Sequence, residues 1–208
     1  PDASIAGLVP LSSHVSPYVV KTTGGDFLMT WRLGGLPFVG REEWEIEHRH
    51  QTFNRMLQTL RAPDFVNVAF WVHDLRRRGA IESQARFRTR FNQALSDQYF
   101  DILSSQRIMR NELYLTMIYR PIVVGKRLVE RSTDLRVLQA QQDQAVAKVM
   151  ELAGNVEAVL KDYAPVRLGL YEADNGVVFS EVLEHFGFLL NRIDEPVPAL
   201  AAPIHDYL

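Results

Sequence analysis

The stretch NELYLTMIYR (residues 111–120) decides the fold, because it has the composition of a strand at the centre of a sheet. Its apolar residues fall at both odd and even positions. Successive residues of a strand point to opposite faces, so this segment is apolar on both faces. We therefore predict a central strand that ends at Pro121.

Four further segments have the pattern of strands. Residues 15–21 and 27–33 flank Thr23-Gly24-Gly25-Asp26, which predicts a hairpin because both glycines take positive φ at little steric cost. Residues 166–172 form a last strand before a turn at 174–176. A strand with one buried face is predicted where apolar residues alternate with others, at Val66, Val68, Phe70 and Val72.

Four segments have the periodicity of helices: 41–61, 84–106, 133–163, and one that Ser180 caps and that ends near Asn191. The segment 133–163 has apolar residues at a/d positions over about four heptads. We interpret it as a long helix packed across the sheet, since Gln142, Ala145 and Gly154 weaken a coiled-coil surface. The segment 84–106 has an apolar face made of Phe87, Phe91, Leu95, Tyr99 and Ile102. We assign Phe87 and Phe91 to the core.

This alternation predicts an α/β (α+β-like) fold, a mixed β-sheet covered by helices, with one long helix and a C-terminal helix. Residues 1–14 are predicted to be an irregular lead-in, and residues 15–192 a single α/β domain. Residues 193–208 are rich in proline and alanine, as linkers are.

Composition excludes several kinds of chemistry. The chain has 208 residues and no cysteine, which excludes disulfides, thiolate metal sites and a cysteine nucleophile. No basic segment followed by a continuous apolar run marks a signal peptide, and we expect a cytoplasmic protein.

The net charge of −2 conceals an asymmetry. Residues 76–136 contain 13 Arg or Lys against 6 Asp or Glu, or +7, and the remainder contains 10 against 19, or −9. A basic segment fits an anionic membrane surface or nucleic acid, and it also fits ordinary solvated helix faces.

A nucleotide-binding P-loop is not present. The motif needs Gly-x-x-x-x-Gly-Lys-Ser/Thr, so that backbone N–H groups wrap the phosphates. The only Gly-Lys pair is Gly125-Lys126, with Arg120 at the position of the first glycine and Arg127 in place of the Ser/Thr. We expect no ATP hydrolysis and no cofactor in this segment.

A metal site has little support. Glu47 and His50 form a Glu-x-x-His pair on one predicted helix, whereas di-iron bundles need such pairs on two helices and two more carboxylates. His50 falls on the apolar stripe of its helix, where a hydrogen-bonded core histidine is the more common outcome. An enzyme with a site assembled in space near Glu47 and His50 stays the alternative from another class.

The run Arg76-Arg77-Arg78 is the candidate binding site. It follows a strand and precedes Gly79, so it is either a solvated strand end or a docking point for acidic protein or lipid headgroups. Nucleic acid is better recognised where aromatic residues interleave with arginines. A nucleic-acid-binding module that uses residues 76–136 is therefore a weaker alternative than protein or membrane docking.

Five stretches together resemble the N-terminal region of the CagE/TrbE/VirB family, the ATPases of type IV secretion and conjugation systems. They follow the family's order and cover most of the chain: SSHVSPYVVKTTGGDFLMTWRLGGLPF (12–38), NRMLQTLR (54–61), VNVAFWVHDLRRR (66–78), RNELYLTMIYRP (110–121) and FSEVLEHFGFLLN (179–191).

The resemblance implies an α/β domain that precedes a RecA-like motor carrying the Walker motifs, so ATP and magnesium are expected only in that missing C-terminal domain. It implies peripheral attachment at the cytoplasmic face of the bacterial inner membrane. The implied partners are inner-membrane secretion components, including a small membrane protein, and neighbouring subunits. The family's catalytic residues have no counterparts in this sequence.

Overall fold

The structure is a computed structural model that describes residues 10–35, 40–59, 65–79, 86–105, 109–121 and 135–199. The chain divides into two compact units. Unit 1 comprises Pro1–Val72 and Tyr114–Leu208, and unit 2 comprises His73–Leu113. Two long strands, β4 (Val68–Arg78) and β5 (Met109–Tyr119), contribute residues to both units.

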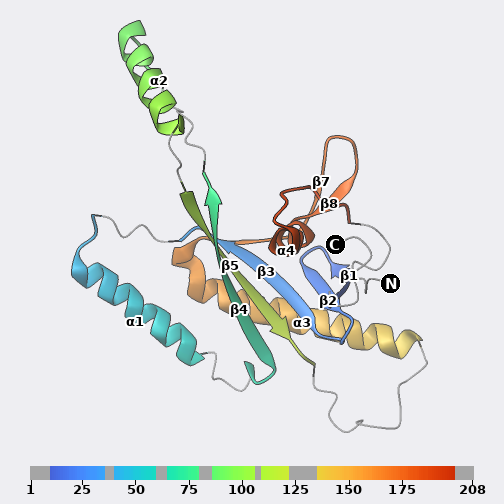
Figure 1. The fold of residues 1–208 in the computed structure, drawn as a ribbon. Helices are drawn as coiled ribbons and strands as arrows, with labels where there is room; N and C mark the ends of the chain where they lie inside the picture. Colours follow the sequence, from blue (N-terminus) through green and yellow to red (C-terminus); the bar gives the residue numbers. More distant parts are fainter. Residues whose placement is uncertain are drawn as a thin grey trace, which may run out of the picture. The chain divides into compact units, whose positions relative to one another are not determined.

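The other elements follow in chain order (Figure 1). The remaining strands are β1 (Leu11–Ser16), β2 (Val19–Thr22), β3 (Phe27–Leu33), β6 (Pro165–Arg167), β7 (Leu170–Glu172) and β8 (Val178–Ser180). The helices are α1 (Glu43–Thr59), α2 (Arg90–Ser105), α3 (Leu135–Leu160) and α4 (Glu181–Asn191), and a 3-10 turn, η3 (Lys161–Tyr163), extends α3.

The main sheet has the strand order β1-β2-β3-β5-β4, and β6 also pairs with β3. The prediction that residues 111–120 form a central strand is confirmed, because β5 lies between β3 and β4. The predicted hairpin is confirmed too: β2 and β3 are antiparallel, and Gly25 in their turn has a φ of +86°. The Thr22 hydroxyl accepts a hydrogen bond from the Asp26 N–H at 2.9 Å, which closes the turn.

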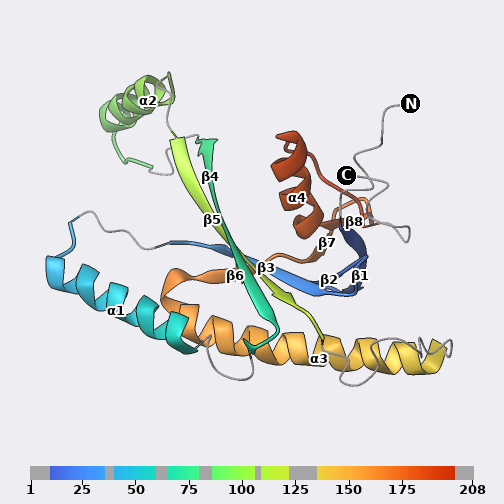
Figure 2. The same ribbon diagram turned by 60° about the horizontal axis from the view of Figure 1, so that its bottom comes forward.

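Helices cover both faces of this sheet, and Figure 2 shows α3 and α4 on opposite sides of it. Residues Phe27, Met29 and Trp31 of β3 join one buried cluster with α3. The alternate residue Thr30 points the other way, as the pleat requires, and bonds to Thr116 of β5. On that second face, Tyr114 of β5 stacks on His185 of α4 with ring centroids 4.1 Å apart. The predicted α/β fold is confirmed.

The long helix packs across the sheet as interpreted. Its buried residues lie in the C-terminal two thirds, from Ala145 to Leu160, whereas Leu135 and Leu138 in its first turns are exposed. The predicted cap of α4 is also confirmed, since the Ser180 hydroxyl accepts a hydrogen bond from the Leu183 N–H at 3.2 Å.

Three strand boundaries differ from expectation. Strand β1 begins at Leu11, within the predicted lead-in. The predicted strand 15–21 is two strands, because a turn at Pro17-Tyr18 separates β1 from β2. The predicted strand 166–172 is two strands, because Leu168 N–H donates to Thr30 O and Leu170 N–H donates to Pro17 O. Gly169 lies between them, and a Cβ there would approach the Tyr18 ring to 2.6 Å.

The described part of the predicted linker lies against β8. The Ser180 N–H donates to Val197 O, and the Ala199 N–H donates to Val178 O. An isolated bridge joins Phe179 and Pro198. Residues 193–199 therefore include segments that add to the fold, and residues 200–208 lie outside the described part of the chain.

Candidate docking surfaces

The three arginines predicted as a binding site divide into two kinds. All three lie in β4, where alternate residues face opposite ways. Arg77 is turned toward β5 and its Nε lies 3.0 Å from Glu112 Oε2, with only 16% and 12% of the two side chains exposed. Arg76 and Arg78 are exposed. The exposed part of this run is therefore the Arg76/Arg78 face of β4, and Arg77 belongs to the fold of unit 2.

The neighbouring strand places another arginine beside Glu112. Arg110 of β5 pairs with Glu112 as well, and 64% of its side chain is exposed. Gly79 follows β4 next to it, since a Cβ on Gly79 would contact the Arg110 side chain at 3.6 Å. One carboxylate thus serves two guanidinium groups, and this end of the β4–β5 pair keeps a net positive charge.

Helix α2 presents a second surface in unit 2. The Thr89 hydroxyl accepts a hydrogen bond from the Asn92 N–H at 3.3 Å, and the Gln93 side chain accepts one from the Phe87 N–H at 3.0 Å. These two hydrogen bonds cap the N-terminus of the helix. Its apolar face is exposed to solvent, with exposed fractions of 75%, 58%, 58% and 55% at Phe91, Leu95, Tyr99 and Ile102.

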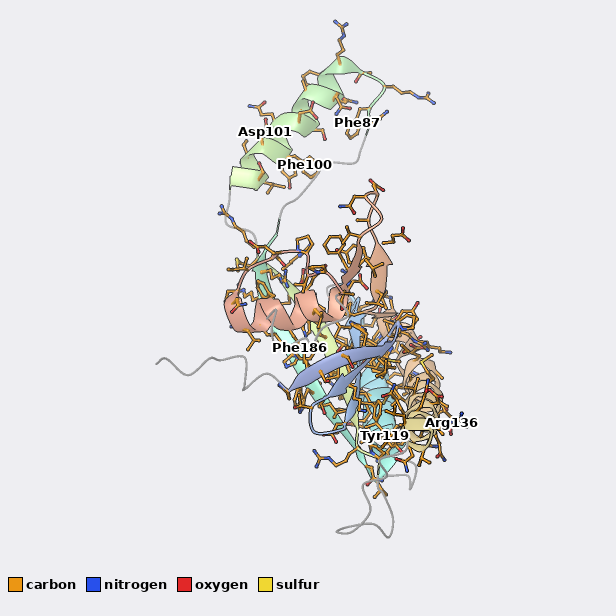
Figure 3. The ribbon with its side chains drawn as sticks, turned by 90° about the vertical axis from the view of Figure 1, so that its right-hand side faces the viewer. Phe87, Phe100, Asp101, Tyr119, Arg136 and Phe186 are labelled. Atoms are coloured by element: carbon orange, nitrogen blue, oxygen red, sulfur yellow. The ribbon has the colours of Figure 1, made fainter. Side chains whose placement is uncertain are left out.

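The assignment of Phe87 and Phe91 to the core was wrong. Both are exposed, and three exposed arginines alternate with them just before and at the start of α2: Arg86, Arg88 and Arg90. Figure 3 labels Phe87 on this approach and Asp101 near the other end of the helix. The apolar spacing alone did not distinguish a covered face from an uncovered one, whereas the alternation of arginine and phenylalanine was a signal of exposure.

The prediction that Val66, Val68, Phe70 and Val72 form the buried face of a strand was correct for only two of the four residues. Val68 and Phe70 pack against the core cluster, but Val66 and Val72 are exposed. Strand β4 is the last strand in the sheet order, and only its first residues meet the cluster.

Helix α1 gives the metal alternative no support. Glu47 accepts a hydrogen bond from Gln51, and His50 is exposed, so the assignment of His50 to a core position was wrong. Within the described residues, no group of three or more His, Asp or Glu side chains could hold a metal ion. A shallow depression of about 240 Å³ between α1 and η3 is lined by neither Glu47 nor His50, but by Trp44, Glu45, His48, Arg49, Thr52, Asp162 and Tyr163.

One serine–histidine pair resembles catalytic geometry and is structural. His14 Nε2 lies 2.7 Å from Ser180 Oγ. Ser180 is fully buried and its hydroxyl already accepts the Leu183 N–H. Burial lowers the pKa of His14 more than its contact with Ser16 O raises it. The pair joins β1 to the start of α4, and no substrate can reach the hydroxyl.

Two predictions lie partly or wholly beyond what the structure describes. Gly125-Lys126, the failed P-loop, falls outside the described residues, as do residues 80–85, 106–108 and 122–134 of the basic segment 76–136. In the residues that are described, no helix is long and apolar enough to cross a membrane.

Comparison with known proteins gives the family. Residues 18–126 match the family model described as the type IV secretion system ATPase VirB4/TrbE, N-terminal domain. The chain is 34% identical over 218 residues to the type IV secretion system protein virB4 of Brucella suis biovar 1 (strain 1330), which covers all of this chain and 26% of that protein.

Two other relatives agree. The chain is 31% identical over 215 residues to the type IV secretion system protein PtlC of Bordetella pertussis (strain Tohama I / ATCC BAA-589 / NCTC 13251), covering 100% of the chain and 25% of PtlC. It is 26% identical over 196 residues to virB4 of Bartonella quintana (strain Toulouse), covering 91% of the chain and 24% of that protein. The chain spans about a quarter of the length of these relatives, and it belongs to the VirB4/TrbE family of type IV secretion system ATPases, where it corresponds to the N-terminal domain.

Proposed function

We propose that this chain is the non-catalytic docking and scaffold domain of a type IV secretion ATPase. It positions a motor at the cytoplasmic face of the inner membrane and transmits the motor's conformational changes to the secretion channel. Its partners are inner-membrane secretion components, including a small membrane protein, and neighbouring subunits. Membership in the VirB4/TrbE family supports this proposal.

The chemistry resides elsewhere in the parent protein. The parent hydrolyses ATP with magnesium in a motor domain outside these 208 residues, which correspond to only 26% of a virB4 relative. The failed P-loop at Gly125-Lys126 supports this division, because Arg127 replaces the hydroxyl residue that would hold magnesium. The purified chain is expected to hydrolyse no ATP, and a magnesium-dependent release of phosphate above background would contradict the assignment.

The Arg76/Arg78 face is the observation that supports docking most directly. These two guanidinium groups are exposed on a strand at the end of the sheet order, while Arg77 between them is engaged with Glu112. Arginine presents a planar set of donors that suits carboxylates of an acidic protein surface. Exposed cations also accelerate encounter with an anionic partner at low salt.

The test is charge reversal on that face. The double variant R76E/R78E is expected to lose co-purification with inner-membrane secretion components while keeping its fold, because neither side chain is buried. The control R32E/R55E makes the same change in net charge at two exposed arginines of unit 1 and should co-purify as the wild type does. Unchanged co-purification of R76E/R78E would exclude this face as the contact.

A further inference from the structure

The outer edge of strand β4 is long and regular. The strand has 11 residues and is the last strand of the sheet order, with β5 as its neighbour. Strand β1, at the other end of that order, has 6 residues, and its pairing with β2 contains two register shifts. Short or irregular edge strands resist further pairing. Of the two end strands that the structure describes in the main sheet, β4 is therefore the better template for another strand.

The part of β4 that belongs to unit 2, here called the edge segment, is His73–Arg78. Along it the residues alternate between exposed and less exposed, and the exposed ones are Asp74, Arg76 and Arg78. Because successive residues of a strand point to opposite faces, these three side chains share one face and lie two residues apart. This face therefore carries one negative charge followed by two positive charges.

We propose that an acidic segment of a partner protein adds to the edge segment as a further strand, with its carboxylates opposite Arg76 and Arg78. This inference rests on the proposed docking function of the Arg76/Arg78 face and specifies how the partner binds. Residues directly opposite in neighbouring strands have Cβ atoms about 4.5–5.5 Å apart, close enough for ion pairs. A partner with acidic residues two positions apart meets both arginines, and a basic residue two positions further meets Asp74.

A polypeptide fits this edge better than a membrane or a nucleic acid does. The outer edge of a strand presents a row of backbone N–H donors and C=O acceptors. Phosphate groups accept hydrogen bonds but supply no donors for the carbonyls, and the exposed carboxylate of Asp74 repels them. An extended peptide supplies both donors and acceptors at the spacing of the strand, which is how β-strand addition works.

A second copy of the chain matches the charges of the edge segment only in part. On the exposed face each copy offers one carboxylate, that of Asp74, against two arginines. A pairing that sets Arg76 and Arg78 opposite the same arginines of the second copy places like charges directly opposite one another, which is destabilising. The charges therefore favour a different, acidic chain over self-pairing.

The probe is a synthetic peptide of about seven residues, which spans the edge segment at about 3.4 Å per residue. Two glutamates and one lysine occupy alternate positions among threonines, and the reversed sequence is tested as well, so that antiparallel and parallel addition are both covered. We expect one of the two to bind the 208-residue chain with a Kd below about 1 mM in an NMR titration. If neither binds in that range, strand addition is excluded.

A permuted peptide is the control for net charge. It has the same composition, but its two glutamates are adjacent, so in an extended strand their carboxylates point to opposite faces. We expect it to bind on the order of tenfold more weakly, because only one carboxylate then faces the arginines. Equal affinity of the alternating and permuted peptides would contradict the proposed register of charges.

Backbone N-methylation distinguishes an added strand from contact through side chains alone. In an added strand, alternate N–H groups face β4 and the others face solvent. Methylating one alternate set should abolish binding, and methylating the other set should leave it nearly unchanged, although both peptides keep the same charges. Equal affinities of the two methylated peptides would overturn strand addition.

Hydrogen exchange of the chain gives a second readout. The amides of the edge segment that face away from β5 should exchange on the order of tenfold more slowly when the probe is saturating. Unchanged exchange at these amides would contradict the proposal. Protection that appears without the peptide and grows with chain concentration would assign the edge to a second copy instead.

The variant R76E/R78E separates this inference from the docking function on which it rests. It should bind the probe on the order of tenfold more weakly, and a probe with lysines in place of the glutamates should bind it more tightly than it binds the wild type. If R76E/R78E loses co-purification while the two methylated peptides bind equally, docking stands and strand addition fails. Loss of binding to phosphatidylserine vesicles in R76E/R78E, with no binding of any peptide, would assign the face to a membrane.

Discussion

Trp31 of β3 donates its indole N–H to Glu157 of α3, with Nε1 2.7 Å from Oε1. The same carboxylate accepts hydrogen bonds from Arg167 of β6, including one of 2.8 Å from Nη2 to Oε2. Trp31 is fully buried, so its N–H needs a partner inside the molecule. One carboxylate therefore connects two strands and the long helix of unit 1.

Replacing Glu157 should destabilise unit 1. We expect Glu157→Ala to lower the free energy of unfolding by about 1–3 kcal/mol, because the change leaves a buried donor without its acceptor. The control is Glu151→Ala on the same helix, whose exposed pair with Lys148 should contribute less than about 1 kcal/mol. Urea unfolding followed by circular dichroism measures both. Equal losses in the two variants would mean that Trp31 gains nothing from this acceptor.

The threonine pair at the centre of the sheet makes a sharper prediction. Thr30 and Thr116 share a hydrogen bond of 2.9 Å and neither side chain is exposed. Thr30→Val should cost about 1–3 kcal/mol, since it leaves the Thr116 hydroxyl unsatisfied. The double variant T30V/T116V removes both polar groups and should be more stable than the single variant. A double-mutant cycle by urea unfolding gives the coupling energy, and additive losses would contradict the pair.

Two leucines on α3 separate the packed part of this helix from its exposed beginning. Leu152 is fully buried in the core cluster, so Leu152→Ala should cost about 2–5 kcal/mol through lost contacts and a cavity. Leu135 lies on the same helix but is 79% exposed, and Leu135→Ala should change the free energy of unfolding by less than about 0.5 kcal/mol. Thermal unfolding distinguishes the two. A large loss for Leu135→Ala would mean that the first turn is covered in solution.

Stability should fall in two steps as the pH decreases. Burial lowers the pKa of His14 and of His73, so the folded state resists their protonation and stability declines as the pH falls below about 6.5. The hydrogen bond from Arg167 lowers the pKa of Glu157, which adds stability above about pH 4.5 that is lost as the pH falls through the folded-state value.

Variants assign these steps. His14→Asn should reduce the slope of unfolding free energy between about pH 6.5 and 5, leaving the part due to His73. Glu157→Gln should reduce the slope at lower pH only. His50→Asn, at an exposed histidine of α1, controls for the substitution itself. If the free energy of unfolding of the His14→Asn variant had the same pH dependence as that of the wild type, His14 would bind protons equally in the folded and unfolded states, which would contradict the prediction.

The main elements could be predicted because their causes are local. The apolar residues of β5 alternate on both faces, and only a strand between two covered faces accommodates them. The Gly24-Gly25 turn and the Ser180 cap are likewise set by a few neighbouring residues. The start of β1 at Leu11 was not predicted. Its pairing partner, Thr22, lies in β2 on the other side of a turn, so the sequence around Leu11 does not reveal the pairing.

The docking surfaces could not be predicted in the same way, because exposure depends on residues far along the chain. The apolar residues of α2 and of α3 follow the same helical spacing, but those of α3 from Ala145 onward join the buried cluster, whereas those of α2 are exposed. Arg77 differs from Arg76 and Arg78 because Glu112 lies on the neighbouring strand. His50 likewise has the helical spacing of the apolar residues in α1, but its side chain is exposed to solvent.

The most direct measurement asks whether the 208-residue chain, without a motor domain, captures inner-membrane secretion components from detergent extracts of cells that produce the secretion system. Mass spectrometry identifies what is captured. We predict that the wild-type chain retains type IV secretion membrane proteins in the absence of ATP and that R76E/R78E does not. Retention that requires an attached motor, or that is equal for wild type and R76E/R78E, would contradict docking through this face.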